Sequence, residues 1–351
     1  MLLYIHIPFC DSKCSYCAFN TYVDKFHLQK EYMHALKKQL LYELEHFDVT
    51  CKSIESVFIG GGTPSTIAYE LYEPLFTLLK PYLKEKIEIT AEANPNSATR
   101  VWLEGMYSLG VNRISFGVQS FDNDKLKLLN RAHNPQSAIK AIKNAHHIGF
   151  KNLSLDIIYG VQGDTDNLIE NDITIAFSLP INHISAYALT IEEGTVFQKT
   201  PHMSNEKLEI TQNLFKDITC KGFKQYEISN FGSYYSQHNI GYWDYKDYIG
   251  LGCGAVGFLK DTRFYPTSSL ECYISNPLDI HEEKLSQEDI KIEKIFLGLR
   301  SFVGLNQGIL NTKEQNKADL LVKEKKLTCK EGKYYNLDYL LSDELALFIT
   351  T

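Results

Sequence analysis

The sequence predicts an α/β protein with a largely parallel sheet, followed by a smaller α+β region. Short apolar strands alternate with amphipathic helices from Leu2 to Leu189. Several of these strands run directly into glycine, asparagine or proline, which favour turns. This alternation is typical of βαβ units, in which successive strands lie parallel. With 351 residues, 44% of them hydrophobic, the chain is long enough to bury a full core.

Six strands and their connecting helices can be assigned in order. The expected strands are residues 2–7, 56–59, 87–93, 113–118, 152–159 and 183–189. The expected helical segments are residues 25–47, 70–83, 99–109, 122–149 and 165–179, and the segment 122–149 is expected to hold more than one helix. In the first helix, Tyr32, Leu36 and Leu40 recur at helical spacing, while lysines and glutamates occupy the other faces. Periodicity alone fits either an open barrel or a doubly wound sheet.

The C-terminal part of the chain reads as a separate accessory domain. A change in composition over residues 271–279 indicates a boundary, so we expect domains at 1–270 and 280–351. A helical stripe begins near Ser286. It is followed by an expected helix at 320–327, a turn at Gly332 within a small hairpin, and a helix at 340–348.

Charge and the N-terminal segment exclude some classes of function. A formal net charge of -7 and a pI near 5.9 give no overall field that attracts nucleic acid, so no nucleic-acid partner is expected. Residues 1–9 are apolar but lack a basic leader, and the run ends before it reaches the length of a signal or membrane-spanning segment. These observations predict a cytoplasmic protein that does not span a membrane.

Cys10, Cys14 and Cys17 follow the first strand and form the most specific motif of the chain. Three thiolates at this spacing can bind one iron–sulfur cluster and leave one iron without a protein ligand. A structural zinc site is the other metal reading, but it needs a fourth ligand, and Phe19 occupies the candidate position. The remaining cysteines are scattered and are expected to be ordinary reduced thiols: Cys51, Cys220, Cys253, Cys272 and Cys329.

The cysteine spacing resembles that of the radical S-adenosylmethionine (SAM) superfamily. The run from Tyr4 to Cys10, Tyr-Ile-His-Ile-Pro-Phe-Cys, resembles the oxygen-independent coproporphyrinogen III oxidase family, and the resemblance covers nearly the whole chain. It implies a [4Fe–4S] cluster whose open iron chelates the methionine moiety of SAM, and one-electron cleavage of SAM to a 5′-deoxyadenosyl radical. It also implies a partial (β/α)6 TIM-type barrel followed by a winged-helix-like C-terminal domain.

In a barrel the functional residues lie at the C-terminal ends of the strands. Gly60, Gly61 and Gly62 follow the second strand, where the lack of a Cβ lets the backbone approach a ligand. Glu92 ends the third strand, and its carboxylate suits the ribose hydroxyls. The resemblance implies that SAM is bound by Tyr4, Gly60, Gly61, Gly62, Thr63, Glu92, Gln119, Arg131 and Asp156.

Two functions share this expected fold. One is a coproporphyrinogen III dehydrogenase, which decarboxylates substrate propionates, and the other is a heme chaperone of the HemW type, which hands heme to respiratory proteins at the membrane. Oxidases of the family carry a further cysteine where this chain has Phe19, and a long segment ahead of the motif that here begins at Tyr4. The run His238-Asn-Ile-Gly-Tyr242-Trp243 matches the heme-binding motif of the chaperone branch. All three features favour the chaperone.

Two further classes stay open at this level, namely a scaffold without catalysis and a radical SAM enzyme acting on an unrelated substrate. We expect SAM binding without coproporphyrinogen oxidation, and leave reductive cleavage of SAM open. His238 is the expected heme ligand, because neutral imidazole is a common axial ligand and the neighbouring aromatic residues suit a porphyrin face. The alternative ligands are His6, His133, His183 and Cys253.

Overall fold

The computed structural model describes residues 1–351. The strands are β1 (Leu2–Ile7), β2 (Ile54–Gly61), β3 (Leu83–Ala93), β4 (Arg113–Gln119), β5 (Asn152–Tyr159), β6 (His183–Ala188), β7 (Lys224–Gln225), β8 (Asn230–Gly232), β9 (Tyr248–Leu251), β10 (Gly257–Leu259), β11 (Thr262–Pro266), β12 (Ile280–Lys284), β13 (Leu305–Asn306), β14 (Leu327–Lys330) and β15 (Lys333–Asn336). The helices are α1 (Gln29–His46), α2 (Glu73–Leu79), α3 (Arg100–Ser108), α4 (Asn123–Leu128), α5 (Pro135–Ile148), α6 (Asp166–Phe177), α7 (Leu208–Cys220), α8 (Gln237–Trp243), α9 (Leu270–Ser275), α10 (Gln287–Leu299), α11 (Thr312–Lys323) and α12 (Ser342–Thr350).

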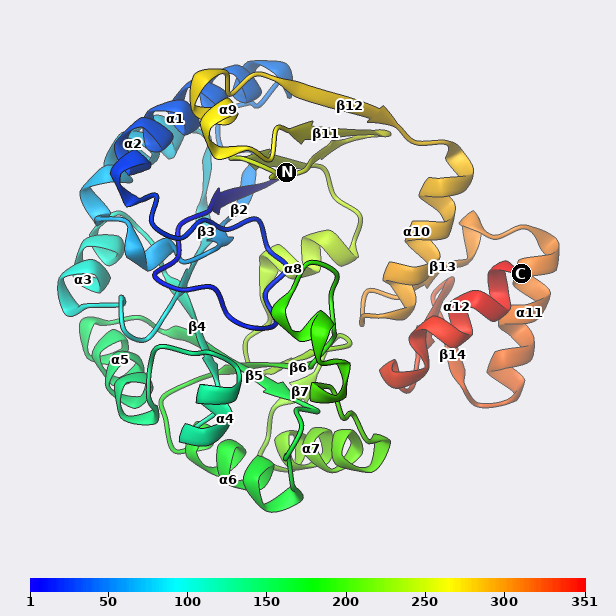
Figure 1. The fold of residues 1–351 in the computed structure, drawn as a ribbon. Helices are drawn as coiled ribbons and strands as arrows, with labels where there is room; N and C mark the ends of the chain where they lie inside the picture. The colour runs from blue at the N-terminus through cyan, green and yellow to red at the C-terminus, as the bar shows by residue number, and fades with distance from the viewer.

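One curved sheet forms the main body of the protein. Its strand order is β12-β11-β10-β9-β1-β2-β3-β4-β5-β6-β8-β7, and β1 to β6 are parallel neighbours in chain order. The order is linear, with β12 and β7 at opposite ends, so the sheet is an open, partial barrel. Helices α1 to α6 lie in an arc on its convex side (Figure 1). This architecture confirms the expected α/β fold of a radical SAM partial barrel.

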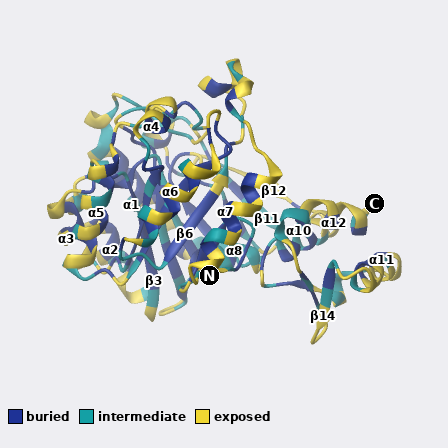
Figure 2. Ribbon diagram, turned by 90° about the horizontal axis from the view of Figure 1, so that it is seen from below, coloured by how far each residue is buried: buried dark blue, intermediate teal, exposed yellow.

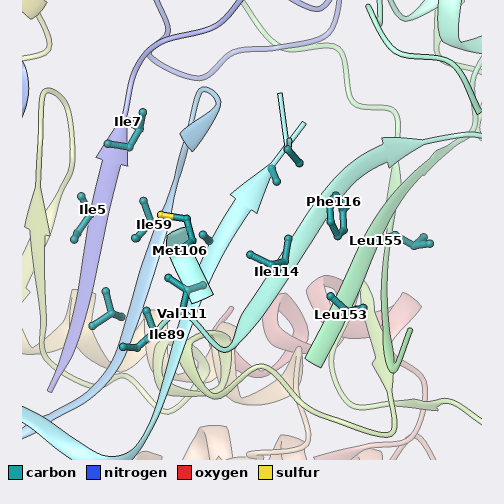
Figure 3. Close-up of a cluster of buried hydrophobic side chains, with 14 of the residues drawn as sticks. Ile5, Ile7, Ile59, Ile89, Met106, Val111, Ile114, Phe116, Leu153 and Leu155 are labelled. Carbon is teal, nitrogen blue, oxygen red and sulfur yellow. The ribbon is translucent and has the colours of Figure 1, made fainter. Parts of the chain in front are cut away.

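The alternation of side chains along each strand decides what the barrel interior contains. Ile5 and Ile7 of β1 belong to the core between sheet and helices, as do Ile114 and Phe116 of β4 (Figure 3). Because successive side chains point to opposite faces, the residues between them face the barrel interior. That interior set is largely polar or aromatic: Tyr4, His6, Ser56, Phe58, Glu88, Thr90, Glu92, Arg113, Ser115, Ser154, Asp156 and His183.

The sheet extends beyond the six expected strands at both ends. Strand β9 pairs in parallel with β1, and β10, β11 and β12 follow it in antiparallel order, while β8 and β7 extend the other edge from β6. The segment 122–149 contains two helices, consistent with the expectation of more than one, because Asn134 caps a new helix and Pro135 occupies its first position.

The C-terminal part contains the three-stranded sheet β13-β15-β14 and helices α10 to α12, consistent with a winged-helix-like domain. The expected helix at 320–327 has the wrong bounds: α11 begins at a capping box formed by Asn311 and Glu314 and ends at Lys323, and Leu327 starts β14. The first half of α11 is polar, so apolar spacing does not mark where this helix begins. Figures 1 and 2 show this part beside the barrel.

The two parts have separate cores. The main core contains 57 buried residues, and a second core of 10 residues lies between Ile295 and Ile349. Strand β12 pairs with β11, so the large sheet continues to Lys284. We therefore propose a division into two domains, and place its boundary after Lys284 rather than within 270–280. No helix combines the length and the apolarity needed to cross a bilayer.

Candidate functional site

Two neighbouring cavities lie inside the barrel, separated by the loop that carries the three cysteines (residues 8–25, the cysteine loop). The first cavity, of about 500 Å³, is lined by the cysteine loop and by the C-terminal ends of β2 to β6. The second, of about 610 Å³, is lined by β1, α8, β9, β10, β11 and α10. Ala18 and Phe19 line both cavities. Phe19, a residue that is 68% exposed, therefore stands where the two cavities meet.

The first cavity collects most of the residues expected to bind the cluster and SAM. The expected residues that line it are Cys10, Cys14, Cys17, Gly61, Gly62, Thr63, Glu92, Gln119, Arg131 and Asp156. Two expected residues do not line it. Gly60 is buried between the Phe58 ring and the Glu92 carboxylate, and Tyr4 lines the second cavity. The shared location follows from the parallel strands, whose C-terminal ends meet at one rim.

The cysteine thiols lie at different depths and have different partners. Cys10 is buried, its Sγ lies 3.4 Å from Thr63 Oγ1, and burial raises the pKa of its thiol to about 11. Cys14 Sγ accepts a hydrogen bond of 3.1 Å from Arg131 Nη1. Burial also raises the pKa of Cys17. Hydrogen bonds and a cation near these sulfurs would stabilise the thiolate form that iron requires.

The arrangement of these thiols fits a four-iron cluster. No three His, Cys, Asp or Glu side chains converge closely enough to hold a single metal ion. In a [4Fe–4S] cluster each thiolate ligates its own iron, so the three sulfurs need not meet at a point. Arg131 Nε, in the wall of the same cavity, is buried without a hydrogen-bond partner. The donor set and the free Nε–H of Arg131 are consistent with a cluster and an anionic ligand group here.

Close packing within the protein explains the glycines at the end of β2 and directly after it. A Cβ at Gly61, where φ is +110°, would lie 2.5 Å from the His6 ring. A Cβ at Gly62 would lie 2.9 Å from the carbonyl oxygens of Ile7 and Phe9, and 3.0 Å from Cys10 Sγ. These residues therefore allow β1 and the cysteine loop to pack against β2, in addition to any contact with a ligand.

Two carboxyl groups face the first cavity from β3 and β5, the strands on either side of β4. Glu92 Oε2 accepts a hydrogen bond of 3.1 Å from Gly61 N, and Asp156 Oδ1 accepts one of 3.3 Å from Ser115 Oγ. Burial, followed by the nearby Asp156 carboxylate, raises the pKa of Glu92 to about 8. Burial also raises the pKa of Asp156. A ligand that donates hydrogen bonds, such as a pair of hydroxyls, would stabilise the ionised forms.

Arg131 and Gln119 complete the wall at the end of β4. Arg131 Nη2 donates to the Gly117 carbonyl at 2.7 Å, so one guanidinium connects β4 to Cys14. A Cβ at Gly117 would lie 3.3 Å from Arg131 Nη2 and 3.1 Å from Gln119 Nε2, which explains a glycine at this position. Gln119 itself has φ of +69°, an uncommon conformation for a residue with a side chain.

His238 lies in the wall of the second cavity, on α8. Its Nδ1 is 2.8 Å from Ser56 Oγ, and its Nε2 is 3.0 Å from the Tyr242 hydroxyl. The residue is 1% exposed, and burial lowers the pKa of the imidazole to about 3, so the ring is neutral at physiological pH. Among the alternative ligands, only His6 lines the same cavity.

Sequence reasoning missed several residues that build the second cavity and its surroundings. Glu88 accepts hydrogen bonds from the backbone N of Gln237 and of His238, at 2.9 and 3.1 Å, and so fixes the start of α8. Arg263 and Glu293 face each other in the cavity wall. The sequence does indicate that Glu88 faces the barrel interior, since it precedes Glu92 by four residues and therefore lies on the same face of β3. No such pattern marks Arg263 or Glu293.

Comparison with known proteins agrees with this geometry. Residues 4–175 match the family model described as the radical SAM superfamily. The heme chaperone HemW of Bacillus subtilis is 33% identical over 322 residues, covering 87% of this chain and 84% of that protein. HemW of Escherichia coli is 36% identical over 263 residues, covering 73% and 69%.

The solved structure of Escherichia coli coproporphyrinogen III oxidase (HemN) matches with a TM-score of 0.82, covering 100% of this chain and 90% of that chain. Its sequence identity is 19%, so the match shows a shared fold and nothing finer. The relatives are at least 33% identical to this chain over more than two thirds of both chains. The chain therefore belongs to the radical SAM superfamily and, within it, to the HemW family.

Proposed function

We propose that this protein is a heme chaperone that binds heme in the second cavity, beside a [4Fe–4S] cluster and SAM in the first. The relatives from Bacillus subtilis and Escherichia coli carry the name heme chaperone. The observation that carries the proposal is the neutral, buried His238 imidazole in the wall of an aromatic-rich cavity. A volume of about 610 Å³ lies within the usual range for sites that bind organic ligands.

The lining of the second cavity suits a porphyrin. Its walls carry many aromatic rings, which offer apolar surface to a flat macrocycle, and the histidine supplies an iron ligand. The aromatic residues are Tyr4, Phe19, Phe58, Tyr242, Tyr245, Tyr248 and Phe258. This combination supports a heme site better than a site for a small polar substrate.

His238 is a better candidate ligand than His6. His6 Nε2 is 2.8 Å from the backbone carbonyl of Asn20, and its Nδ1 is 3.0 Å from the Tyr4 hydroxyl. A backbone carbonyl cannot turn away without moving the cysteine loop. The partner of His238 Nε2 is the side-chain hydroxyl of Tyr242, which needs only a rotation to free the nitrogen.

The first cavity supports the cofactor part of the proposal. Cys10, Cys14 and Cys17 would hold the cluster, and Glu92 and Asp156 would accept hydrogen bonds from SAM. When bound, the cluster and SAM supply the one-electron chemistry of the superfamily. Phe19 stands at the position where the oxidases carry a further cysteine, which favours the chaperone over an oxidase. We place the protein in the cytoplasm, delivering heme to respiratory proteins at the membrane.

The test is a hemin titration of the cluster-reconstituted protein under anaerobic conditions. We expect one heme per chain, and a weaker affinity or an altered Soret band for His238→Ala, while iron content and SAM binding stay unchanged. His147→Ala on α5 is the matched control, because that histidine is exposed and distant in sequence. An unchanged affinity and spectrum in His238→Ala would remove His238 as the ligand. SAM-dependent conversion of coproporphyrinogen III would instead assign the protein to the oxidases.

A further inference from the structure

In the wall of the second cavity, a carboxylate from the C-terminal part of the chain pairs with an arginine of the large sheet. Glu293, on α10, forms an ion pair with Arg263 of β11, from guanidinium Nη2 to carboxylate Oε1. Its second oxygen, Oε2, accepts a hydrogen bond of 2.5 Å from the Tyr245 hydroxyl. All three residues line the cavity. Arg263 and Tyr245 therefore already form a site that binds both oxygens of one carboxylate.

The charges in this cavity are distributed unevenly. His238 and His6, on the α8 and β1 side, carry neutral imidazoles because burial lowers their pKa, whereas Arg263 and Lys246 are the cations in the lining. Lys246 Nζ is paired with Glu55 Oε2 at 2.6 Å, and Glu55 also binds Lys84. Apart from Glu293, the acidic neighbour of Arg263 is Glu283, whose oxygen is 3.9 Å from Nη1. Glu293 is thus the main counter-ion of the guanidinium.

We propose that Arg263 and Tyr245 form the carboxylate subsite of the second cavity, which Glu293 fills in the ligand-free protein and a carboxylate of the bound porphyrin takes over. The inference rests on the proposed function, since the ligand class is a porphyrin that carries carboxylate side chains. Arginine suits this role because its planar fork binds carboxylates in a fixed geometry. Tyr245 serves as a donor because burial, followed by the neighbouring Glu293, raises its pKa.

Replacement of Glu293 by a ligand carboxylate explains why the ligand-free protein holds a glutamate beside Arg263. The Arg263 and Glu293 side chains are 29% and 28% exposed, so an unpaired charge here would lose part of its hydration. Glu293 keeps the guanidinium paired until a ligand carboxylate replaces it. The replacement removes one contact between α10 and the barrel, so ligand binding and the position of the C-terminal domain are coupled in both directions.

The test compares hemin with hemin dimethyl ester, in which both carboxylates are blocked. The natural protein should bind hemin at least tenfold more tightly than the diester, because charge-assisted hydrogen bonds of this kind are worth about a factor of ten or more. Arg263→Met should remove this preference and leave diester binding unchanged. Glu293→Gln should tighten hemin binding several-fold, because the competing charge is gone. Arg300→Met is the matched control, since Arg300 is 32% exposed and pairs with Asp343 outside the cavity.

Arg263→Met alone leaves the Glu293 carboxylate without its partner and can prevent folding. The double variant, Arg263→Met with Glu293→Gln, removes that carboxylate as well and is used in this case. It too should bind hemin and the diester equally well. Weaker hemin binding by Glu293→Gln would overturn the inference, as would a normal preference for hemin in both Arg263 variants. If the Soret band changes in His238→Ala while the Arg263 variants keep the preference, the subsite is wrong and the heme site stands. If neither residue affects hemin binding, the proposed heme cavity itself fails.

Discussion

The Oγ atom of Ser56 lies 2.8 Å from Nδ1 of His238, although the two residues are 182 positions apart in the sequence. Ser56 faces the barrel interior from β2, and α8 brings the imidazole to it. The other ring nitrogen, Nε2, contacts the Tyr242 hydroxyl at 3.0 Å. The ring is therefore held from both sides, and an iron atom that approaches from the cavity must replace the hydroxyl of Tyr242.

This arrangement predicts that Tyr242→Phe binds heme more tightly. The substitution keeps the aromatic wall and removes the hydroxyl that competes for Nε2. A hydrogen bond of this kind contributes about 1 kcal/mol, so the dissociation constant should fall about fivefold. Titration followed at the Soret band measures the change, and Tyr248→Phe is the control, since Tyr248 lines the same cavity without a hydrogen bond to the imidazole. Weaker binding would mean that the Tyr242 hydroxyl contacts the heme directly.

Glu88 is predicted to position His238. Its carboxylate accepts hydrogen bonds from the backbone N of Gln237 and His238 and, at 2.9 Å, from the Tyr234 hydroxyl. In Glu88→Gln an amide NH2 would face some of these donors, so the free energy of unfolding should fall by about 1–3 kcal/mol. The Soret band of the heme complex should shift as well, because the start of α8 moves.

Glu314→Gln is the control for Glu88→Gln, because it removes a buried carboxylate at another helix start, away from His238. Glu314 is buried, and its carboxylate accepts a hydrogen bond of 2.8 Å from Asn311 N at the start of α11. Its loss should lower the unfolding free energy without any change in the heme spectrum. A Soret band in Glu88→Gln identical to that of the natural protein would show that Glu88 matters for stability alone.

The sequence allowed the parallel strands and the first cavity to be predicted because both follow from local patterns. The apolar runs of β1 and β5 are dense enough to mark strands, and the three cysteines lie within one loop. Glu92, near the end of β3, and Asp156, within β5, then line one cavity because the C-terminal halves of parallel strands lie at the same side of the barrel. Strands β10 and β11 escaped prediction, since they are three and five residues long and pair only with neighbours in the folded sheet.

The second cavity depends on contacts that no local pattern encodes. Tyr4 and Phe58 alternate correctly toward the interior, but the sequence does not show which of two cavities they reach. That division arises because the cysteine loop folds across the barrel and places Phe19 between them. The pairing of Arg263 with Glu293 likewise needs α10, in the C-terminal part of the chain, to reach β11 of the large sheet. Each contact joins segments whose relative position only tertiary structure fixes.

The cysteine assignment predicts a defined loss of iron. Replacing Cys10, Cys14 and Cys17 by Ala should abolish the iron–sulfur absorption and the bound sulfide, while the far-UV circular dichroism of the barrel persists. The matched control replaces three exposed cysteines, Cys51, Cys220 and Cys272, and should keep the full iron content. Iron and sulfide at the level of the natural protein in the first variant would refute the assignment.

Glu92 is predicted to make the cluster-free protein less stable as pH rises. Burial raises the pKa of this carboxyl from 4.5 to about 8, so between these values the folded state holds a proton that the unfolded state has released. Stability therefore falls with rising pH across this window, by up to about 1.4 kcal/mol per pH unit. Glu92→Gln lacks this term, so its unfolding free energy relative to the natural protein should grow from pH 4.5 to about pH 8 and then level off.

Glu43→Gln is the matched control for this prediction. Burial raises the pKa of Glu43 to about 7, but that residue lies on α1 and does not line the first cavity. Its stability difference should therefore level off about one pH unit earlier, and SAM binding should not change. Glu92→Gln should weaken SAM binding about tenfold, because an ionised carboxylate accepts stronger hydrogen bonds from ligand hydroxyls than an amide does. If both variants bind SAM equally well, Glu92 does not contact the cofactor, whatever the pH profile shows.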